Sequence, residues 1–282
     1  MRRGLAVAAV LAATAVAGCG AEEDLVVAGT APAAPYDGPL YVPAQELDED
    51  SARAVRVGSG AAGRALECHG EIYSGGGSEP WSKGDGGSTA EGGLEAYFEI
   101  EQPDVPRSGY RVEREERGRV LFSYDVDGRT KVAVIVAKDR EDRPGWGPET
   151  SASCDPAELP ESFTATKEYE IWTDKDGHRV PTTEISSSVG AAHCDWQKAH
   201  FLELGAHQDR KLYARDPDGV LEPAMLNAAY DGDVPMPDDA HDTGYRLGDR
   251  RLWLTEDTST AYVRTADGVE AWPRVKDGVA CK

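Results

Sequence analysis

Apolar and polar residues alternate along several segments of the chain, which is the pattern of a strand with one buried face. Val120, Phe122 and Tyr124 alternate ahead of the turn Asp125-Val126-Asp127-Gly128, and the alternation resumes from Val132 to Val136. Asp-Gly is favoured in such turns because glycine accepts a positive φ. The pattern therefore predicts a hairpin whose two strands present one apolar face.

Further turns and a second hairpin follow the same pattern. The sequence Asp-x-Asp-Gly recurs at 174–177 and 216–219, each time after a short apolar run, and we expect residues 252–254 to pair with residues 261–263. Helix signals are few. Ser-Thr-Ala-Glu at 88–91 has capping-box spacing, and a short helix is expected from Pro223. We predict an α+β protein that is rich in antiparallel sheet.

The N-terminal residues have the pattern of a secretory signal peptide. Two arginines precede an apolar run from Leu5 to Ala17, which is too short to cross a bilayer because a span takes about 20 apolar residues. Two cleavage sites compete at its end. Ala15-Val16-Ala17 fits ordinary signal peptidase, which would release the protein. Val16-Ala17-Gly18-Cys19 resembles a bacterial lipobox, in which Cys19 becomes the first mature residue and its sulfur carries diacylglycerol.

The number of cysteines favours the lipobox. The chain has five cysteines, and an odd number leaves one thiol unpaired in an oxidising compartment. If Cys19 is lipidated, four cysteines remain to form disulfides. The alternative is that Cys19 is discarded with the signal peptide or stays free. Two acyl chains anchor a protein stably, while one chain binds only marginally. We therefore predict that the chain associates with the membrane through a palmitate-bearing anchor on Cys19.

The charge of the chain excludes one class of partner. Lys and Arg number 30 against 51 Asp and Glu, which gives a net charge of −21. Phosphate backbones are repelled by such a chain, so nucleic acid is not expected as a partner. Anionic lipids repel it too, and we expect the anchored body to stand off the membrane.

We predict four regions along the chain. They are a lipoprotein signal peptide (1–18), the acylated cysteine with a flexible spacer (19–45), a first α+β domain (46–160) and a second α+β domain (161–282). The spacer is inferred from Ala, Pro, Gly and acidic residues that show no helix or strand periodicity. A strand around residues 25–28 is the alternative.

The two predicted domains share an order of motifs. Each contains Gly-Tyr-Arg, at 109–111 and at 244–246, and a tryptophan shortly before its second cysteine, Trp146 and Trp272. The spacing between these motifs differs, so a duplication with insertions and a coincidence both remain open. If the halves are related, the simplest of the three possible disulfide pairings is Cys68–Cys154 with Cys194–Cys281. Each disulfide would then close a long loop within its own half.

Beside the lipobox, three stretches of the mature chain carry a resemblance to a known group of proteins. They are Glu170-Ile171-Trp172-Thr173-Asp174, His193-Cys194-Asp195-Trp196-Gln197, and the tail from Asp242 through Leu252-Trp253-Leu254 to Trp272-Pro273-Arg274. In these residues the chain resembles the uncharacterised lipoproteins of high-GC Gram-positive bacteria of the streptomycete type. The resemblance implies a lipid-anchored protein on the outer face of the cytoplasmic membrane, and it supplies no activity.

No segment carries a catalytic or cofactor motif, so we assign no catalytic residue, no cofactor and no metal site. The Asp-x-Asp-Gly turns lack the other ligand positions of a calcium loop. His193, His200 and His207 recur every seven residues, but their surroundings are not helical, and we expect them on different elements. In the glycine-rich stretch 82–89 the lysine precedes the glycines, whereas a P-loop lysine follows them.

Tryptophans are candidates for stacking on a sugar or for contact with a partner protein. Trp172, Trp253 and Trp272 lie in apolar alternation and are expected in the core. Trp81 lies in a glycine-rich loop. We predict it as the exposed ligand contact.

These observations favour a non-catalytic binding or interaction module of the cell envelope, whose partner is an envelope protein or a glycan. The alternative is an envelope hydrolase with an acidic residue pair that the sequence does not reveal. A hydrolase is expected to show one concave pocket in which two or more polar side chains of shifted pKa converge. A binding module is expected to show an apolar groove or patch without them.

Overall fold

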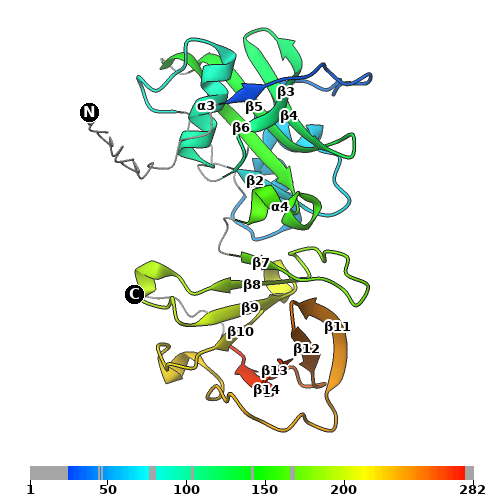
Figure 1. Cartoon of the computed structure of the whole chain (residues 1–282). Helices are drawn as coiled ribbons and strands as arrows, with labels where there is room; N and C mark the ends of the chain where they lie inside the picture. Colours follow the sequence, from blue (N-terminus) through cyan, green and yellow to red (C-terminus); the bar gives the residue numbers. More distant parts are fainter. Residues whose placement is uncertain are drawn as a thin grey trace, which may run out of the picture.

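The computed structural model describes residues 25–43, 45, 47–75, 81–102, 105–140, 143–165 and 169–276. These residues form two domains, which lie one above the other in Figure 1. The predicted signal peptide, Cys19 and Cys281 lie outside the described residues. Within the described part, no helix is both long and apolar enough to traverse a membrane.

The first domain is built on a six-stranded sheet in the order β1-β3-β4-β5-β6-β2, in which β1 and β3 are parallel and the other neighbours are antiparallel. The strands are β1 (Val26–Val27), β2 (Ile72–Gly75), β3 (Ser108–Glu116), β4 (Arg119–Val126), β5 (Arg129–Arg140) and β6 (Arg143–Cys154). The helices are α1 (Ala52–Gly58), α2 (Gly60–Ala65), α3 (Ala90–Ile100), the 3-10 helix η1 (Pro156–Glu158) and α4 (Glu161–Thr164).

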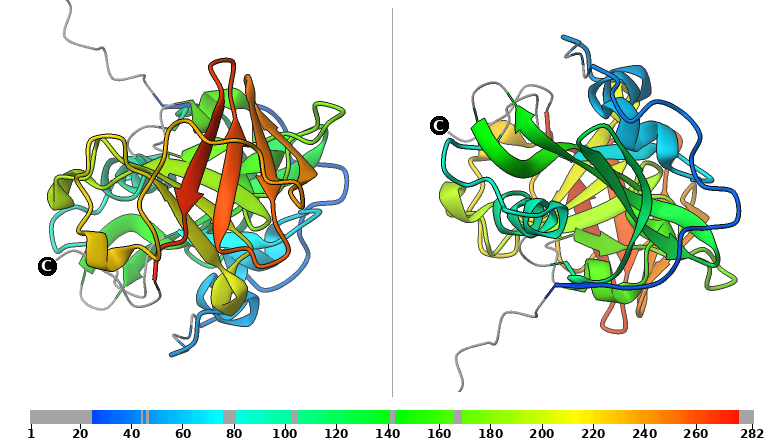
Figure 2. Two further views of the ribbon diagram at one scale, coloured as in Figure 1. Left: turned by 90° about the horizontal axis from the view of Figure 1, so that it is seen from below. Right: turned by 90° about the horizontal axis from the view of Figure 1, so that it is seen from above.

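Helices cover both faces of this sheet. α3 packs with α4 on the face that carries Phe122 and Val134, and Figure 2 (right) shows α3 along its axis against the strands. The small residues of α2 pack on the opposite face, around Leu121 and Ile135. The predicted hairpin of β4 and β5 is confirmed. Because helices cover both faces, these two strands bury more than the single apolar face that alternation predicts.

Helix α3 begins one residue later than the capping box predicts. Its N-cap is Thr89, whose Oγ1 accepts a hydrogen bond from the backbone N–H of Gly92 at 3.1 Å. The glycines inside the helix permit close packing on β6. A Cβ at Gly93 would lie 3.0 Å from Cβ of Trp146 and 3.1 Å from the backbone of Gly147.

Residues 25–43, which we call the strap, are not the flexible spacer that the sequence predicts. β1 pairs with β3, as in the alternative of a strand at 25–28. Nη1 of Arg114 donates to the carbonyls of Tyr36 and Gly38 at 3.0 and 2.8 Å, and Leu40 is buried in the core beneath α2. Because the domain satisfies these polar groups and buries Leu40, the first domain begins near residue 25 and not at 46.

The second domain consists of two four-stranded antiparallel sheets, in the orders β10-β9-β8-β7 and β11-β12-β13-β14. The strands are β7 (Tyr169–Ile171), β8 (Ile185–Val189), β9 (His200–Leu204), β10 (Lys211–Arg215), β11 (His241–Leu247), β12 (Arg250–Leu254), β13 (Thr260–Arg264) and β14 (Val269–Pro273). Three 3-10 helices connect them: η2 (Ala192–Cys194), η3 (His207–Asp209) and η4 (Pro223–Met225). Seen from below, β11 to β14 lie side by side (Figure 2, left).

The eight strands of the second domain enclose one core. Isolated bridges join the two sheets on both sides, from Thr173 to Arg246 and from Tyr213 to Arg274. Trp172 and Trp272 are fully buried inside, as predicted, whereas Trp253 is only partly buried. The predicted pairing of residues 252–254 with 261–263 is also confirmed.

The β-rich α+β class is confirmed, but the helices are unevenly divided. Among the described residues, α1 to α4 all belong to the first domain, and the helix expected from Pro223 is the single 3-10 turn η4. The second domain is therefore all-β and not α+β. The boundary also moves, because Phe163 of α4 packs into the core of the first domain. The first domain thus extends beyond the predicted boundary at 160.

One predicted disulfide is confirmed. Cys68, ahead of β2, is bonded to Cys154 at the end of β6. Cys194 is also disulfide-bonded. Its predicted partner, Cys281, lies outside the described residues, so that pairing stays a prediction.

The repeated motifs occupy corresponding strands of the two domains. Each domain contains a meander of four antiparallel strands, β3 to β6 and β11 to β14. Gly109 and Gly244 lie on the first strand of each meander, with φ of 88° and 89°. Trp146 and Trp272 lie on the fourth. The two meanders are consistent with a duplication. Because the elements ahead of the meanders differ, the duplication stays a prediction.

Candidate functional site

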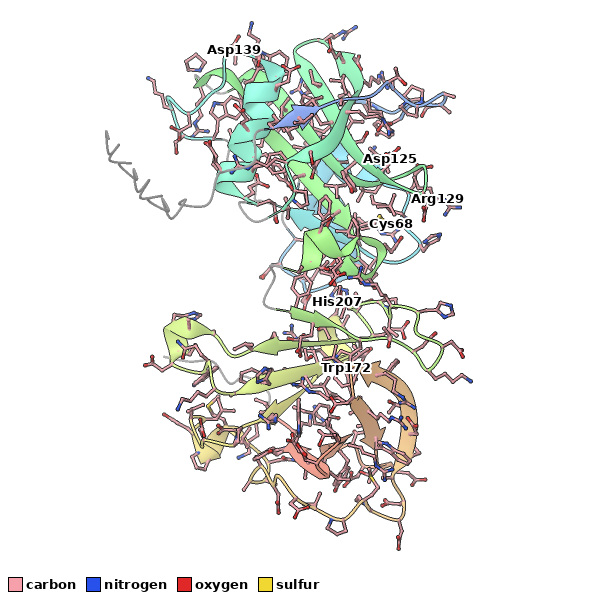
Figure 3. The ribbon with its side chains drawn as sticks, viewed as in Figure 1. Cys68, Asp125, Arg129, Asp139, Trp172 and His207 are labelled. Carbon is pink, nitrogen blue, oxygen red and sulfur yellow. A yellow bond between two sulfur atoms is a disulfide. The ribbon has the colours of Figure 1, made fainter. Side chains whose placement is uncertain are left out.

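A cavity of about 620 Å³ lies at the junction of the two domains. The first domain contributes the edge strand β2, the C-terminal end of α3, β6, η1 and α4, and the second contributes β7, β8, η3 and the turn before β8. His207 of η3 marks this junction in Figure 3. Ligand sites are typically concave, measure roughly 300–1,000 Å³ and often lie between domains. The cavity is therefore the candidate functional site.

One row of side chains crosses the sheet at the floor of the cavity. The register places Tyr73 beside Ser153, Ser153 beside Val132, Val132 beside Tyr124, and Tyr124 beside Tyr110. Directly opposed residues of neighbouring strands point to the same face of a sheet. All of these residues except Tyr124 line the cavity. The cavity therefore extends across the sheet from β2 to β3.

A cluster of packed aromatic rings lies at the inner end of the cavity, which Tyr97, Tyr110 and Phe163 line directly. The ring of Tyr110 packs against Phe98 of α3 and against Tyr124, with centroids 5.2 and 5.6 Å apart. Phe163 of α4 packs on Tyr124 at 4.6 Å, while Tyr97 packs edge-on against Phe98. Interlocked rings of this kind hold one another in place. The inner end is therefore preformed.

The hydroxyl of Tyr110 has no hydrogen-bond partner among the described residues, although the side chain is fully buried. Burial raises the pKa of Tyr110 and of Tyr97, so both phenols stay protonated and are able to donate. Leaving a buried hydroxyl unsatisfied costs about 1–3 kcal/mol. A ligand oxygen that accepts from Tyr110 would remove this cost.

A second polar pair lies beside the inner end. Ser151 of β6 lines the cavity, and its hydroxyl donates to Oε2 of Glu101 at 2.8 Å. Burial raises the pKa of Glu101, and the hydrogen bond from Ser151 opposes that shift. The pair therefore places the hydroxyl of Ser151 at the wall of the cavity, with the carboxyl of Glu101 behind it and outside the lining.

Hydrogen bonds join the domains at the mouth of the cavity. Oη of Tyr73 on β2 lies 2.7 Å from Oγ1 of Thr182, in the turn before β8. Asp155 fixes this threonine by accepting from its backbone N–H at 2.9 Å and from its hydroxyl at 3.0 Å. Burial raises the pKa of Tyr73, so its hydroxyl remains protonated in this link.

His207 forms another link between the domains at the mouth. Its Nδ1 lies 2.9 Å from Oδ1 of Asp50, and its Nε2 lies 2.9 Å from Oε2 of Glu71. Hydrogen bonds to these two carboxylates of the first domain raise the pKa of His207, which favours an imidazolium that donates to both. The φ of His207 is +53°, a conformation that costs energy outside glycine and is concentrated at functional sites.

The cavity fulfils the expectation for a hydrolase only in part. Polar side chains with shifted pKa do converge on it, but the shifts of the tyrosines keep these side chains neutral. Asp50 and Glu71 both bind the imidazole of His207, whereas the acidic pair of a glycosidase keeps the space between its carboxyls for substrate. The expectation for a binding module, an apolar groove or patch without such side chains, is not met in full either, because polar side chains of shifted pKa line the cavity beside its apolar residues.

Trp81 is not the exposed ligand contact that the sequence predicts. Its side chain is only 3% exposed, and it does not line the cavity. A Cβ at Gly147 would lie 2.2 Å from the indole, and one at Gly86 would lie 3.0 Å from its Nε1. The glycines around Trp81 let the loop and β6 pack tightly against the ring, so a glycine-rich loop does not expose it here.

The three histidines fall on η2, β9 and η3, as predicted.

In two of the three Asp-x-Asp-Gly turns the first aspartate accepts hydrogen bonds from the backbone. In the third, Asp125 instead pairs with Arg111 and accepts from Oγ1 of Thr130 at 3.2 Å. Asp174 accepts from the N–H of residues 176 and 178 at 2.8 and 2.9 Å, and Asp216 accepts from the N–H of residues 220 and 221 at 2.8 and 2.9 Å. These carboxylates stabilise their turns, as the interpretation as turn chemistry requires.

Cys68, Cys154 and Glu158 bring metal-ligand atoms together in the described part of the chain. The two sulfurs are bonded to each other, however, and Nζ of Lys131 lies 2.6 Å from Oε2 of Glu158. A disulfide offers no thiolate, and the ammonium group already neutralises the carboxylate. This cluster is therefore a structural ion pair beside a disulfide.

Comparisons with known proteins identify no relative: no family model matches the chain, and neither a curated protein nor a solved structure matches it. A functional interpretation therefore depends on the geometry of the cavity.

Proposed function

We propose that the protein is a lipoprotein, anchored through Cys19 to the outer face of the cytoplasmic membrane, that binds a ligand between its two domains without transforming it. The supporting observation is the cavity itself. It has a preformed aromatic end in the first domain and a hydrogen-bonded mouth to which both domains contribute. Sites of this kind bury most of the surface of a small ligand.

Cysteine chemistry supports the anchor. Cys68 is bonded to Cys154, and Cys194 is also in a disulfide, so Cys19 is available for lipid if Cys281 is the partner of Cys194. Labelled palmitate should enter the wild-type protein and not Cys19→Ala. Label in the variant would refute the anchor, and so would wild-type protein that is recovered unacylated in the culture fluid.

Ligand binding is tested by native mass spectrometry of the protein purified from its own membranes. Thr183 lines the cavity from the second domain, and Thr183→Trp should fill its mouth and abolish a co-purifying species that wild type carries. Ser82→Trp, at an exposed position outside the cavity, is the matched control and should retain that species. The same species on both variants, or none on wild type, would contradict the proposal.

One observation favours the alternative of an envelope hydrolase. Ser151, at the wall of the cavity, donates to the carboxyl of Glu101, whose pKa is raised by burial. If this pair were catalytic, purified cell-wall fragments incubated with the protein should yield cleavage products, which are lost in Glu101→Gln. We expect no such products, because Glu101 does not itself line the cavity and its carboxyl is held by Ser151.

A further inference from the structure

We infer that the ligand of the cavity is an elongated, uncharged amphiphile that ends in a hydrogen-bond acceptor, such as a carbonyl, ether or hydroxyl oxygen, and that this end lies against Tyr110. The inference deepens the proposed binding function and rests on it. Three observations support it: the extent of the cavity, the buried hydroxyl of Tyr110, and the positions of the charged side chains that line the cavity.

The shape of the cavity follows from the register of the sheet. The row from Tyr73 to Tyr110 crosses five neighbouring strands, β2, β6, β5, β4 and β3. Neighbouring strands lie about 4.8 Å apart, so four steps span roughly 19 Å. Val132, Leu159 and Phe163 line the cavity along this path. A long ligand with an apolar middle fits a cavity of this extent, which we call the slot.

The inner end of the slot requires an acceptor. Tyr110 is fully buried, lines the cavity and has no hydrogen-bond partner among the described residues. Nearby ring contacts with Phe98 and Tyr124 hold its side chain in place. A ligand oxygen at this end would satisfy the hydroxyl, whereas a terminal methyl group would leave it unsatisfied.

Charge excludes an anion or a cation at the inner end. Among the described residues that line the cavity, the acidic and basic side chains are Asp50, Glu71, Glu203, His207 and Arg210, and they belong to the mouth or the second domain. Burial raises the pKa of Tyr97 and Tyr110 at the inner end and keeps both phenols neutral. A buried ion without a counter-charge is strongly unfavourable. At the mouth, Arg210 is paired with Glu203 at 3.6 Å, and the net charge of −21 further repels anions.

Straight-chain alkan-2-ones of increasing length are suitable probes, with alkanoates and n-alkanes of equal chain length as comparisons. Titration calorimetry on the full mature protein should show that ketone affinity rises about fourfold with each methylene until the slot is full, and then levels off. The matched alkanoate should bind at least about tenfold more weakly than the ketone, because its charge has no partner at the inner end.

Two variants test the role of Tyr110. Tyr110→Phe should lower ketone affinity about tenfold, the loss expected for one buried hydrogen bond, and should leave n-alkane affinity unchanged. Tyr213→Phe is the matched control, since Tyr213 is equally buried but belongs to the core of the second domain and does not line the cavity. It should leave both affinities unchanged.

The inference is overturned if alkanoates bind as well as ketones, if Tyr110→Phe leaves ketone binding intact, or if affinity does not depend on chain length. Failure of the ligand class is distinguishable from failure of the binding function. A co-purifying species that Thr183→Trp removes, with no ketone binding, would refute the class and leave the function in place.

Discussion

Nε2 of His207 lies 2.9 Å from Oε2 of Glu71, although the two residues belong to different domains. The other nitrogen of the same ring lies 2.9 Å from Asp50. One imidazole therefore ties the second domain to two carboxylates of the first, beside the mouth of the cavity. This arrangement makes the contact between the domains sensitive to the protonation of a single side chain.

The His207 link should weaken as the pH rises. The two carboxylates raise the pKa of His207 in the folded state above about 6.5, the value of an unfolded histidine. Its stabilisation is therefore fully present below about pH 6.5 and is lost as the pH passes the raised value. We expect melting temperature to fall more between about pH 6 and pH 9 in wild type than in His207→Gln.

His193→Gln is the control for this comparison, because His193 is exposed on η2 and lies outside the cavity. It should reproduce the wild-type pH profile. If His207→Gln also keeps that profile, the ion pair does not contribute to stability.

Removing the hydroxyl of Tyr110 should stabilise the ligand-free protein. Phenylalanine keeps the shape of the ring and removes a buried group that has no partner among the described residues, so urea unfolding should show a gain of roughly 1 kcal/mol in the free energy of unfolding for Tyr110→Phe. Tyr213 is buried to the same degree, but its hydroxyl donates to the carbonyl of Thr258 at 2.9 Å. Tyr213→Phe should therefore lose about 1 kcal/mol, and equal effects of the two variants would contradict this explanation.

The Cys68–Cys154 disulfide should contribute strongly to the stability of the first domain. It joins positions 86 residues apart, and closing a loop of that length removes much of the entropy of the unfolded chain. We expect the Cys68→Ala/Cys154→Ala double variant to lose about 3–4 kcal/mol in guanidinium unfolding. Reductant should have a similar effect on wild type and should not further change the first-domain transition of the variant.

Gly93→Ala should destabilise the protein although alanine favours helices. Helix propensity alone would add about 1 kcal/mol of stability, but the new Cβ would lie 3.0–3.1 Å from Trp146 and Gly147. Overpacking of this kind typically costs about 1–3 kcal/mol, so we expect a net loss of roughly 1 kcal/mol by chemical unfolding. Glu95→Ala, at an exposed position of the same helix, should change stability by less than about 0.5 kcal/mol.

Local patterns in the sequence account for part of the fold. The hairpin of β4 and β5 and the pairing of β12 with β13 are predictable because alternation and turn residues lie within one short segment. Helices α1 and α2 were not predicted, since glycines at 58, 60 and 63 disfavour helix. Their formation depends on the N-cap at Ser51 and on the packing of small residues against the sheet.

The cavity was not predictable from local patterns. The row at its floor joins residues 73, 153, 132, 124 and 110, and only the register of five strands brings them together. Tyr110 belongs to the repeated Gly-Tyr-Arg motif, but no property of this motif indicates a buried hydroxyl without a partner among the described residues. Trp81 was misinterpreted because glycines permit either a mobile loop or very close packing, and composition does not distinguish the two.

The docked strap sets how far an anchored protein would reach. Residues 25–43 are fastened to the first domain, so that a lipid on Cys19 would be separated from Leu25 by only six chain steps, or about 20 Å at full extension. An anchored body would then be held closer to the headgroups than the predicted spacer of residues 19–45 would allow.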